Sequence, residues 1–160
     1  MTSAATVKER EVAQSISVDW KAVEVSLDAK GFAILPRLLS PEACAAVAAM
    51  YPEDDRFRSH NCLHQDLYGE HVFPLQVAIL LSEPGRDFEG GEFVLTEQRP
   101  RMQSRAAVVS LRQGDAVVFA VHHRPVRGTR GTYRVNLRHG VSEILRGRRH
   151  TVGIIFHDAT

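Results

Sequence analysis

The sequence lacks several features that mark large classes of proteins. No run approaches the roughly 20 apolar residues of a membrane-spanning helix, and the first residues, MTSAATVKEREVAQ, lack the apolar core of a secretory signal. A P-loop, a Rossmann glycine motif, a nucleophile elbow and internal repeats are also missing. These absences argue against a membrane-spanning or secreted chain and remove the usual sequence signals of nucleotide binding and serine hydrolysis.

Cysteine is scarce. Only Cys44 and Cys62 occur, and they form neither a CxxC motif nor a disulfide framework. This usage suits a reducing compartment, so the expected location is the cytoplasm. It also argues against a structural zinc site, because no third or fourth sulfur or imidazole has suitable spacing.

Lysine is absent from residues 99–149, although this block contains 12 arginines and only two acidic residues, Asp115 and Glu143. Residues 1–98 are acidic instead, with 16 Asp and Glu against 8 Lys and Arg. Arginine suits bidentate contacts to carboxylate or phosphate. The block is therefore either a solvated basic face or a surface for nucleic acid, and the overall charge of +1 weakens the second interpretation.

The N-terminal part of the chain predicts helices. Residues 18–30 carry apolar side chains at helical spacing and are followed by Gly31, a favourable stop. FAILP then predicts a short strand, and Ser40 with Pro41 predicts the start of a second helix that ends before Pro52. The charged segment PEDDRFRSH predicts a loop. Residues 1–60 are thus expected to form a helical lead-in that packs on a barrel.

From residue 61 onward the pattern changes to short β segments separated by turns. The expected strands are PLQVAILLS, EFVLTE, AAVVSL, AVVFAV, RVNLRHGVS and HTVGIIFHD, whereas EPGRDFEGG and HHRPVRGTRGTY are expected to be loops. This order predicts a mainly β fold with N-terminal helices, a double-stranded β-helix of the jelly-roll or cupin type. Its core is expected over residues 61–160, and the length of 160 residues suits one structural domain overall.

His64 and Asp66 form an i, i+2 pair in the segment NCLHQDLYGEHVF. On a strand such a pair shares one face, whereas on a helix the two side chains point to nearly opposite sides. Alone, the pair has two interpretations: ordinary surface residues on an edge strand, or two ligands of a metal ion. A further histidine, His139, lies in RHGVSEILRGRRH, and two imidazoles with one carboxylate are the Fe(II) ligands of non-haem oxygenases.

Five stretches taken together resemble the Fe(II)/2-oxoglutarate-dependent dioxygenases: GFAILPRLLSPEACAAV, HQD, FEGGEFVL, LRQGDAVVF and HGVSEILRGRRH. The resemblance implies that His64, Asp66 and His139 bind Fe(II). It implies that Arg149, ten residues after His139, binds the 2-oxoglutarate co-substrate, with O₂ as the oxidant. Arg148 is a rival for that role, because neighbouring strand residues face opposite ways. Thr151 is expected to share the inward face with Arg149 and to offer a hydroxyl group.

Within this family, CLHQD and HGV are similar to the AlkB-type nucleic-acid repair branch, and in particular to bacterial oxygenases that demethylate damaged DNA oxidatively. GGEFVL and the short spacing from His139 to Arg149 resemble prolyl-hydroxylase-type relatives equally well. The expected substrate contacts are Tyr68, Arg124, Arg127 and Arg130. Two alternatives remain open: a protein or small-molecule hydroxylase, and a jelly-roll binding module that no longer turns over.

Two departures from the family pattern affect the expectations. Tyr68 occupies the position where the repair branch has a second aspartate. In addition, RFRSH runs almost directly into NCLHQD, without the strand and the Tyr-x-x-Gly element that precede this motif in relatives. The chain therefore resembles a shortened member, in which one side of the barrel is expected to be open.

Several other polar residues are assigned structural positions. His122 and His123 are expected in an arginine-rich loop with their rings on opposite sides, and Gln65 is expected to face away from the iron ligands. Gly90 and Gly91 predict a turn or bulge before a strand.

Overall fold

The computed structural model describes residues 17–68, except 51–60, together with residues 70 and 72–156. The expected loop PEDDRFRSH and the first 16 residues of the expected lead-in therefore lie outside the described residues. In the part of the chain that is described, no helix has the length and apolar character needed to cross a membrane.

Two helices precede the main β region, and both begin at side-chain caps. Helix α1 (Trp20–Lys30) starts where Asp19 accepts a hydrogen bond from the backbone N–H of Ala22, and it ends at Gly31 in a left-handed conformation with φ of 81°. Helix α2 (Pro41–Ala48) starts at Ser40, whose hydroxyl accepts from the backbone N–H of Ala43. These starts and the stop at Gly31 match the sequence signals.

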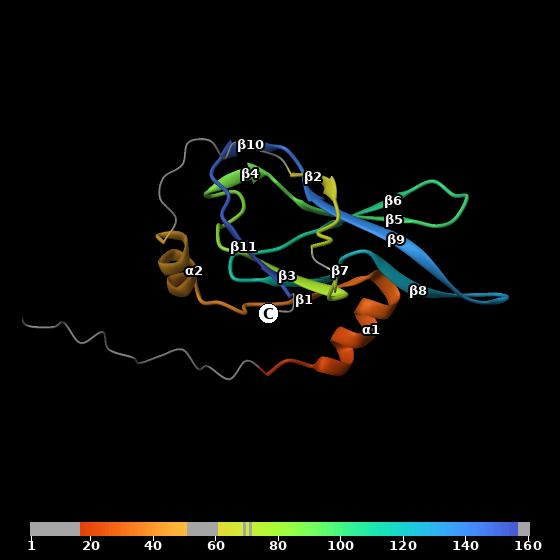
Figure 1. Cartoon of the computed structure of the whole chain (residues 1–160). Helices are drawn as coiled ribbons and strands as arrows, with labels where there is room; N and C mark the ends of the chain where they lie inside the picture. Colours follow the sequence, from red (N-terminus) through yellow and green to blue (C-terminus); the bar gives the residue numbers. More distant parts are fainter. Residues whose placement is uncertain (1–16, 51–60, 69, 71, 157–160) are drawn as a thin grey trace, which may run out of the picture.

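The strands form two main antiparallel sheets and one small one (Figure 1). The first sheet has the order β1 (Phe32–Leu35), β7 (Ala116–Ala120), β3 (Leu75–Leu80) and β11 (Thr151–Ile155). The second has the order β2 (Asn61–His64), β9 (Gly131–Val141), β5 (Phe93–Gln98) and β6 (Arg105–Val109), with β8 (His123–Gly128) also paired to β9. Strands β4 (Phe88–Gly90) and β10 (Ile144–Gly147) pair with each other. The predicted fold class, mainly β with N-terminal helices in a double-stranded β-helix, is confirmed.

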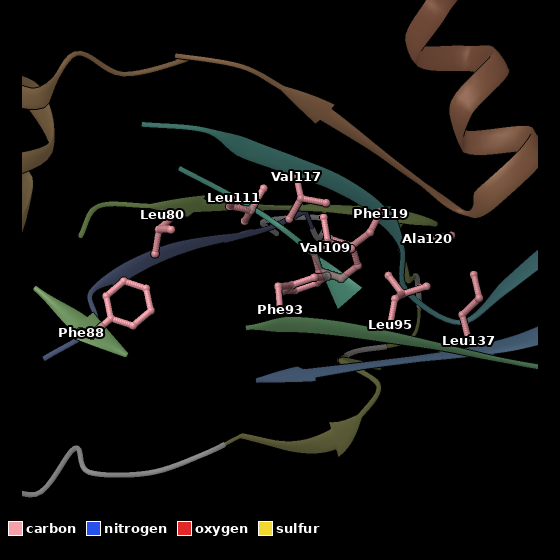
Figure 2. Packing of buried hydrophobic residues seen from close by; sticks show 10 residues of the cluster. All are labelled: Leu80, Phe88, Phe93, Leu95, Val109, Leu111, Val117, Phe119, Ala120 and Leu137. Atoms are coloured by element: carbon pink, nitrogen blue, oxygen red, sulfur yellow. The ribbon is translucent and has the colours of Figure 1, made fainter. Parts of the chain in front are cut away.

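The main core fills the space between the two sheets (Figure 2). It consists of Leu80, Phe88, Phe93, Leu95, Val109, Leu111, Val117, Phe119, Ala120 and Leu137. A second cluster, which includes Cys44 of α2 with Ile79 and Ala116, covers the other face of the first sheet. The alternation of apolar residues along β3 and β7 supplies both clusters, so each of these strands is covered on two faces.

Three expectations for local structure were wrong. HHRPVRGTRGTY is not a loop, because its first half forms β8 in a hairpin with β9 (Figure 1). Its proline, Pro125, is tolerated because the hydrogen bond from Leu137 to His122 places the Pro125–Arg134 pair at a non-hydrogen-bonded position, and β8 pairs only with β9 among the described strands. Likewise, the turn-rich segment EPGRDFEGG ends in β4, which pairs with β10. His122 and His123 do not point apart, because His122 precedes β8 and the ring centroids lie 3.4 Å from each other.

Candidate metal and co-substrate site

The structure brings His64, Asp66 and His139 together. His64 is the last residue of β2 and lies opposite His139 of β9 in the strand register, while Asp66 follows two residues after His64. One potential ligand atom from each residue lies within 4.8 Å of the others. Residues more than seventy positions apart in sequence thus meet because β2 and β9 are neighbours in the same sheet.

The two imidazoles present the same nitrogen to the carboxylate of Asp66. The Nε2 atom of His64 lies 3.5 Å from Asp66 Oδ1, and the Nε2 atom of His139 lies 3.2 Å from Asp66 Oδ2. The Nδ1 atom of His64 is 2.7 Å from the carbonyl oxygen of Cys62, which accepts its proton in one tautomer. That bond leaves the lone pair on Nε2, as in histidines that bind metals.

His139 is 6% exposed and is surrounded by aromatic rings. Its ring lies 4.6 Å from that of Phe119 and 6.1 Å from that of Phe93, between centroids. Burial, reinforced by the charge of His64, lowers the pKa of His139 to about 4, although Asp66 acts in the opposite direction. His139 is therefore neutral at pH 7, which is the form that binds a metal ion.

The segment that carries Asp66 is held by two neighbours. The Nε2 atom of Gln65 donates to the Asn136 side chain and to the Leu137 carbonyl, both at 2.6 Å, so Gln65 points toward β9. The hydroxyl of Tyr68 donates to Asp66 Oδ1 at 3.2 Å. The negative charge of Asp66 and this hydrogen bond raise the pKa of Tyr68. Tyr68, expected as a substrate contact, thus contacts a candidate metal ligand.

Arg149 lies beside a separate cavity of about 350 Å³. Its Nη1 atom donates to the hydroxyl of Thr151 at 3.1 Å, and the guanidinium carbon lies 5.9 Å from the ring centroid of Phe88. Its buried Nε atom has no hydrogen-bond partner among the residues that the structure describes. Burial lowers the pKa of Arg149 to about 10, against the effect of Glu92. Arg149 is still a cation at pH 7, with a donor left for an anionic ligand.

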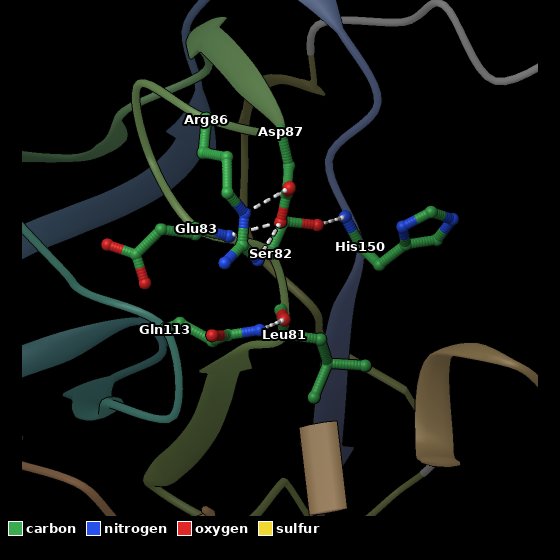
Figure 3. Close-up of polar contacts among 7 residues, drawn as sticks. All are labelled: Leu81, Ser82, Glu83, Arg86, Asp87, Gln113 and His150. Atoms are coloured by element: carbon green, nitrogen blue, oxygen red, sulfur yellow. Dashed lines mark hydrogen bonds and ion pairs between the residues drawn. The ribbon is translucent and has the colours of Figure 1, made fainter. Parts of the chain in front are cut away.

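The backbone on both sides of Arg149 is fixed by the loop that joins β3 to β4. The backbone N–H of Arg148 donates to the Asp87 carbonyl at 3.0 Å. The backbone N–H of His150 donates to the hydroxyl of Ser82 at 2.8 Å, as Figure 3 shows. Asp87 closes the loop by accepting from the backbone N–H of Glu83 at 2.7 Å. The His150 side chain points away from this cluster (Figure 3).

Gly91 is a functional position whose role the sequence pattern did not reveal. It lines the Arg149 cavity and has a positive φ of 65°. A Cβ atom at Gly91 would lie 2.9 Å from Cδ of Arg149. The glycine therefore does more than form a turn, because it leaves room for the stem of the arginine.

The remaining expected contacts lie away from these two groups of residues. Arg124 is buried, pairs with Glu97 through Nε at 3.0 Å and through Nη2, and donates to the Asp28 carbonyl at 2.7 Å. Its guanidinium is therefore engaged inside the protein, in place of the expected substrate contact. Arg127 and Arg130 are exposed on the hairpin of β8 and β9.

The donor set fits iron(II). Two imidazole nitrogens and one carboxylate oxygen, adjacent to one another, form the 2-His-1-carboxylate arrangement of non-haem iron oxygenases. The Arg149 cavity fits a carboxylate, because it is lined by a guanidinium, which also donates to the Thr151 hydroxyl. Phe93 connects the two parts, since it lines this cavity and its ring stacks on that of His139.

Known proteins resemble this chain to different degrees. A crystal structure of a Pseudomonas putida prolyl-4-hydroxylase aligns with 79% of this chain and 98% of that protein, with a TM-score of 0.41 and 14% sequence identity. Uncharacterized proteins from two strains of Mycobacterium tuberculosis are 58% identical over 99 residues, which is 62% of this chain. The matched stretch spans 42% of the length of those relatives.

A family model also matches the chain. It is described as an oxygenase catalysing oxidative methylation of damaged DNA, and it matches residues 45–159, which is more than half of the chain. The matched range contains His64, Asp66, His139 and Arg149. The chain therefore belongs to this family of oxygenases.

Proposed function

We propose that the protein is an Fe(II)- and 2-oxoglutarate-dependent dioxygenase that hydroxylates a C–H bond. One observation carries this proposal: the cluster of His64, Asp66 and His139 lies near a cavity where a buried donor of Arg149 has no partner among the described residues. When bound, iron(II) with 2-oxoglutarate and O₂ supplies the oxidation that converts C–H to C–OH, with release of succinate and CO₂.

Separate groups of residues bind the metal and the co-substrate in this proposal. His64, Asp66 and His139 hold the metal, and Tyr68 orients the Asp66 carboxylate by its hydrogen bond. Arg149 and Thr151 bind the distal carboxylate of 2-oxoglutarate, and the Phe88 and Phe93 rings keep water from that cavity. The reducing cytoplasm is the proposed location, where Cys44 and Cys62 stay as the free thiols observed.

As substrate we propose N-methylated DNA, because the family description names damaged DNA. The exposed arginines Arg127, Arg130, Arg134 and Arg138 all belong to β9 or to its hairpin with β8, so they lie on the sheet that carries His139. Their charges suit contacts to phosphates, which position a nucleic acid without reading its sequence. A target base would have to leave its stack to reach the metal site.

Iron and co-substrate binding is tested without turnover. Under anaerobic conditions, Fe(II) and 2-oxoglutarate should give the visible charge-transfer band of the chelate with the wild type and with His123→Ala. The band should disappear in His139→Ala, because a metal ligand is lost. A wild type without the band, or an undiminished band in His139→Ala, would overturn the dioxygenase proposal.

The role of Arg149 is tested by titrating the same band with 2-oxoglutarate. Arg149→Gln should weaken co-substrate binding by about 100-fold, because a charged hydrogen bond to a carboxylate contributes about 3 kcal/mol. The matched control is Arg148→Gln on the neighbouring, exposed residue. An equal loss in both variants would contradict the assignment.

The substrate class is tested by release of succinate and formaldehyde. Single-stranded DNA with N-methylated bases should stimulate both, whereas proline-containing peptides should not. Binding should weaken steeply with salt, and the double variant Arg127→Ala/Arg130→Ala should have a smaller salt dependence. Stimulation by peptides alone would favour a protein hydroxylase. A charge-transfer band without succinate release on any substrate would favour a binding module.

A further inference from the structure

We propose that β11 is a dimerisation edge, at which a second copy of the chain adds its own β11 in antiparallel fashion. In the first sheet β11 stands last in the order and pairs only with β3 among the strands that the structure describes. Every residue of β11 is paired with a residue of β3 without a register shift, so β11 is a regular strand along its whole length. A regular open edge is a template for another strand.

The hydrogen-bond pattern shows which backbone groups face the free side. Leu81 donates its backbone N–H to the His150 carbonyl at 3.0 Å, which marks that pair as hydrogen-bonded. Because hydrogen-bonded and non-hydrogen-bonded pairs alternate in an antiparallel ladder, Val152 and Ile154 bond to β3. Thr151, Gly153 and Ile155 therefore direct their N–H and C=O groups away from β3, toward the open edge.

Among the described residues, β11 itself carries none of the sequence devices that usually prevent association of an edge strand. β11 has the sequence TVGII, with no charged residue, no proline and no bulge. By contrast, the outer strand β6 of the other sheet begins with an exposed arginine, Arg105. The end of β11 and the next residue have exposed apolar side chains, namely Ile154, Ile155 and Phe156. The centroid of the Phe156 ring lies 5.3 Å from that of Phe73.

A second copy is the occupant that this strand fits, because it can pair with itself. A two-fold axis through Gly153 places Gly153 opposite its copy and Thr151 opposite Ile155 of the second copy. All of these residues direct their backbone groups to the free side, so each is bonded in the symmetric pair. Two uncharged strands meet without repulsion, and the first sheets of both copies become one continuous sheet.

Gly153 provides a sharp test, because a side chain there is tolerated in one copy. A Cβ atom at Gly153 meets no heavy atom within 4 Å, and its φ is not in the left-handed region. In the symmetric pair, however, Gly153→Lys places two like charges directly opposite each other. The dimer dissociation constant should rise at least about tenfold, while Gly153→Ala should leave the dimer intact.

Sedimentation equilibrium of the full chain at micromolar concentration measures the association. The wild type, Gly153→Ala and the surface control Val108→Lys should dimerise, and Gly153→Lys and Gly153→Glu should each be monomeric. Mixing the two charged variants should restore a dimer, because opposite charges then face each other across the axis. A wild type that stays monomeric would overturn the proposal, even if slow amide exchange showed that another segment covers β11. A dimer that Gly153→Lys leaves unchanged would overturn it as well.

Discussion

At the scale of single residues, the site depends on small differences between neighbours in sequence. Arg148 and Arg149 are adjacent, but Arg149 is half-buried at the cavity whereas Arg148 is exposed. Both residues lie between β10 and β11, and of the two only Arg149 lines the cavity. Thr151, two positions after Arg149, accepts a hydrogen bond from it. The role of each arginine in the site therefore depends on the environment of its side chain and not on the residue type alone.

Gly91→Ala tests whether the glycine makes room for Arg149. The substitution should reduce the free energy of unfolding by about 1–2 kcal/mol, because alanine is strained at a φ of 65°. It should also weaken 2-oxoglutarate binding, since the new Cβ atom would lie 2.9 Å from Arg149 Cδ. Urea denaturation and the charge-transfer titration measure the two effects. In the control Gly153→Ala neither quantity should fall, and an equal effect in that control would contradict the explanation.

At the scale of elements, the hairpin of β8 and β9 anchors α1 to the sheet. Arg124 of β8 contacts Glu97 of β5 and the carbonyl of Asp28 in α1. Burial acts to raise the pKa of Glu97, but hydrogen bonds from Arg99 and Arg124 hold that pKa below its usual value. One buried arginine thus connects the helix with two strands.

Arg124→Ala should destabilise the protein by about 3 kcal/mol, because it removes a buried arginine and leaves the part-buried carboxylate of Glu97 with one partner fewer. Arg127→Ala, on the same strand but exposed, should change the free energy of unfolding by less than about 0.5 kcal/mol. Urea denaturation of the two variants provides the comparison. Similar values for both would show that the buried pair does not stabilise the fold.

The loop that positions Arg149 should depend on pH through Asp87. Hydrogen bonds from Arg86 and from the backbone N–H of Glu83 lower the pKa of Asp87 to about 2, from an ordinary value of 3.8. Because the folded-state pKa is depressed, the carboxylate stabilises the fold above pH 4, and this contribution is lost as the pH falls toward 2. Asp87→Asn should therefore be less stable than the wild type at pH 6, by about 1 kcal/mol.

The urea midpoints of the wild type and Asp87→Asn should approach each other as the pH falls from 4 toward 2. Groups that both proteins share cancel in this comparison. A difference that stays constant down to pH 3 would assign the effect of the substitution to something other than the charge of Asp87.

At the scale of the whole molecule, the helical N-terminal part packs against the barrel. Cys44 of α2 is fully buried against the first sheet, and the backbone N–H of Ala120 in β7 donates to the Gly31 carbonyl at 2.9 Å. We therefore propose that the lead-in of residues 1–60 and the core of residues 61–160 unfold as one unit. The division at residue 60 would then describe the sequence pattern and not two independent domains.

The single tryptophan makes this proposal testable. Trp20 lies in α1, so its fluorescence follows the lead-in, whereas far-ultraviolet circular dichroism follows the strands. The two signals should give the same urea midpoint if one cooperative transition unfolds both parts. A lower midpoint for the fluorescence would show that α1 separates from the barrel first.

The sequence by itself determined the family and the fold class. Ordered motifs such as HQD and HGVSEILRGRRH indicated the family, and period-2 alternation with turn signals predicted the strands. Local signals also located Ser40 as a helix cap and Gly31 as a helix stop. Such features depend on short-range chemistry, which acts in the same way wherever a segment is placed in a fold.

The tertiary structure alone decided which polar side chains are buried and which are exposed. Arg124, Arg127 and Arg130 look alike in an arginine-rich segment, but pairing between strands buries the first and exposes the others. Likewise, HHRPVRGTRGTY became a strand because β9 offered a partner, and β11 became an edge because no described strand lies on its far side. Long-range pairing is not encoded within one segment, so burial, edges and unpartnered donors emerge only when distant strands meet.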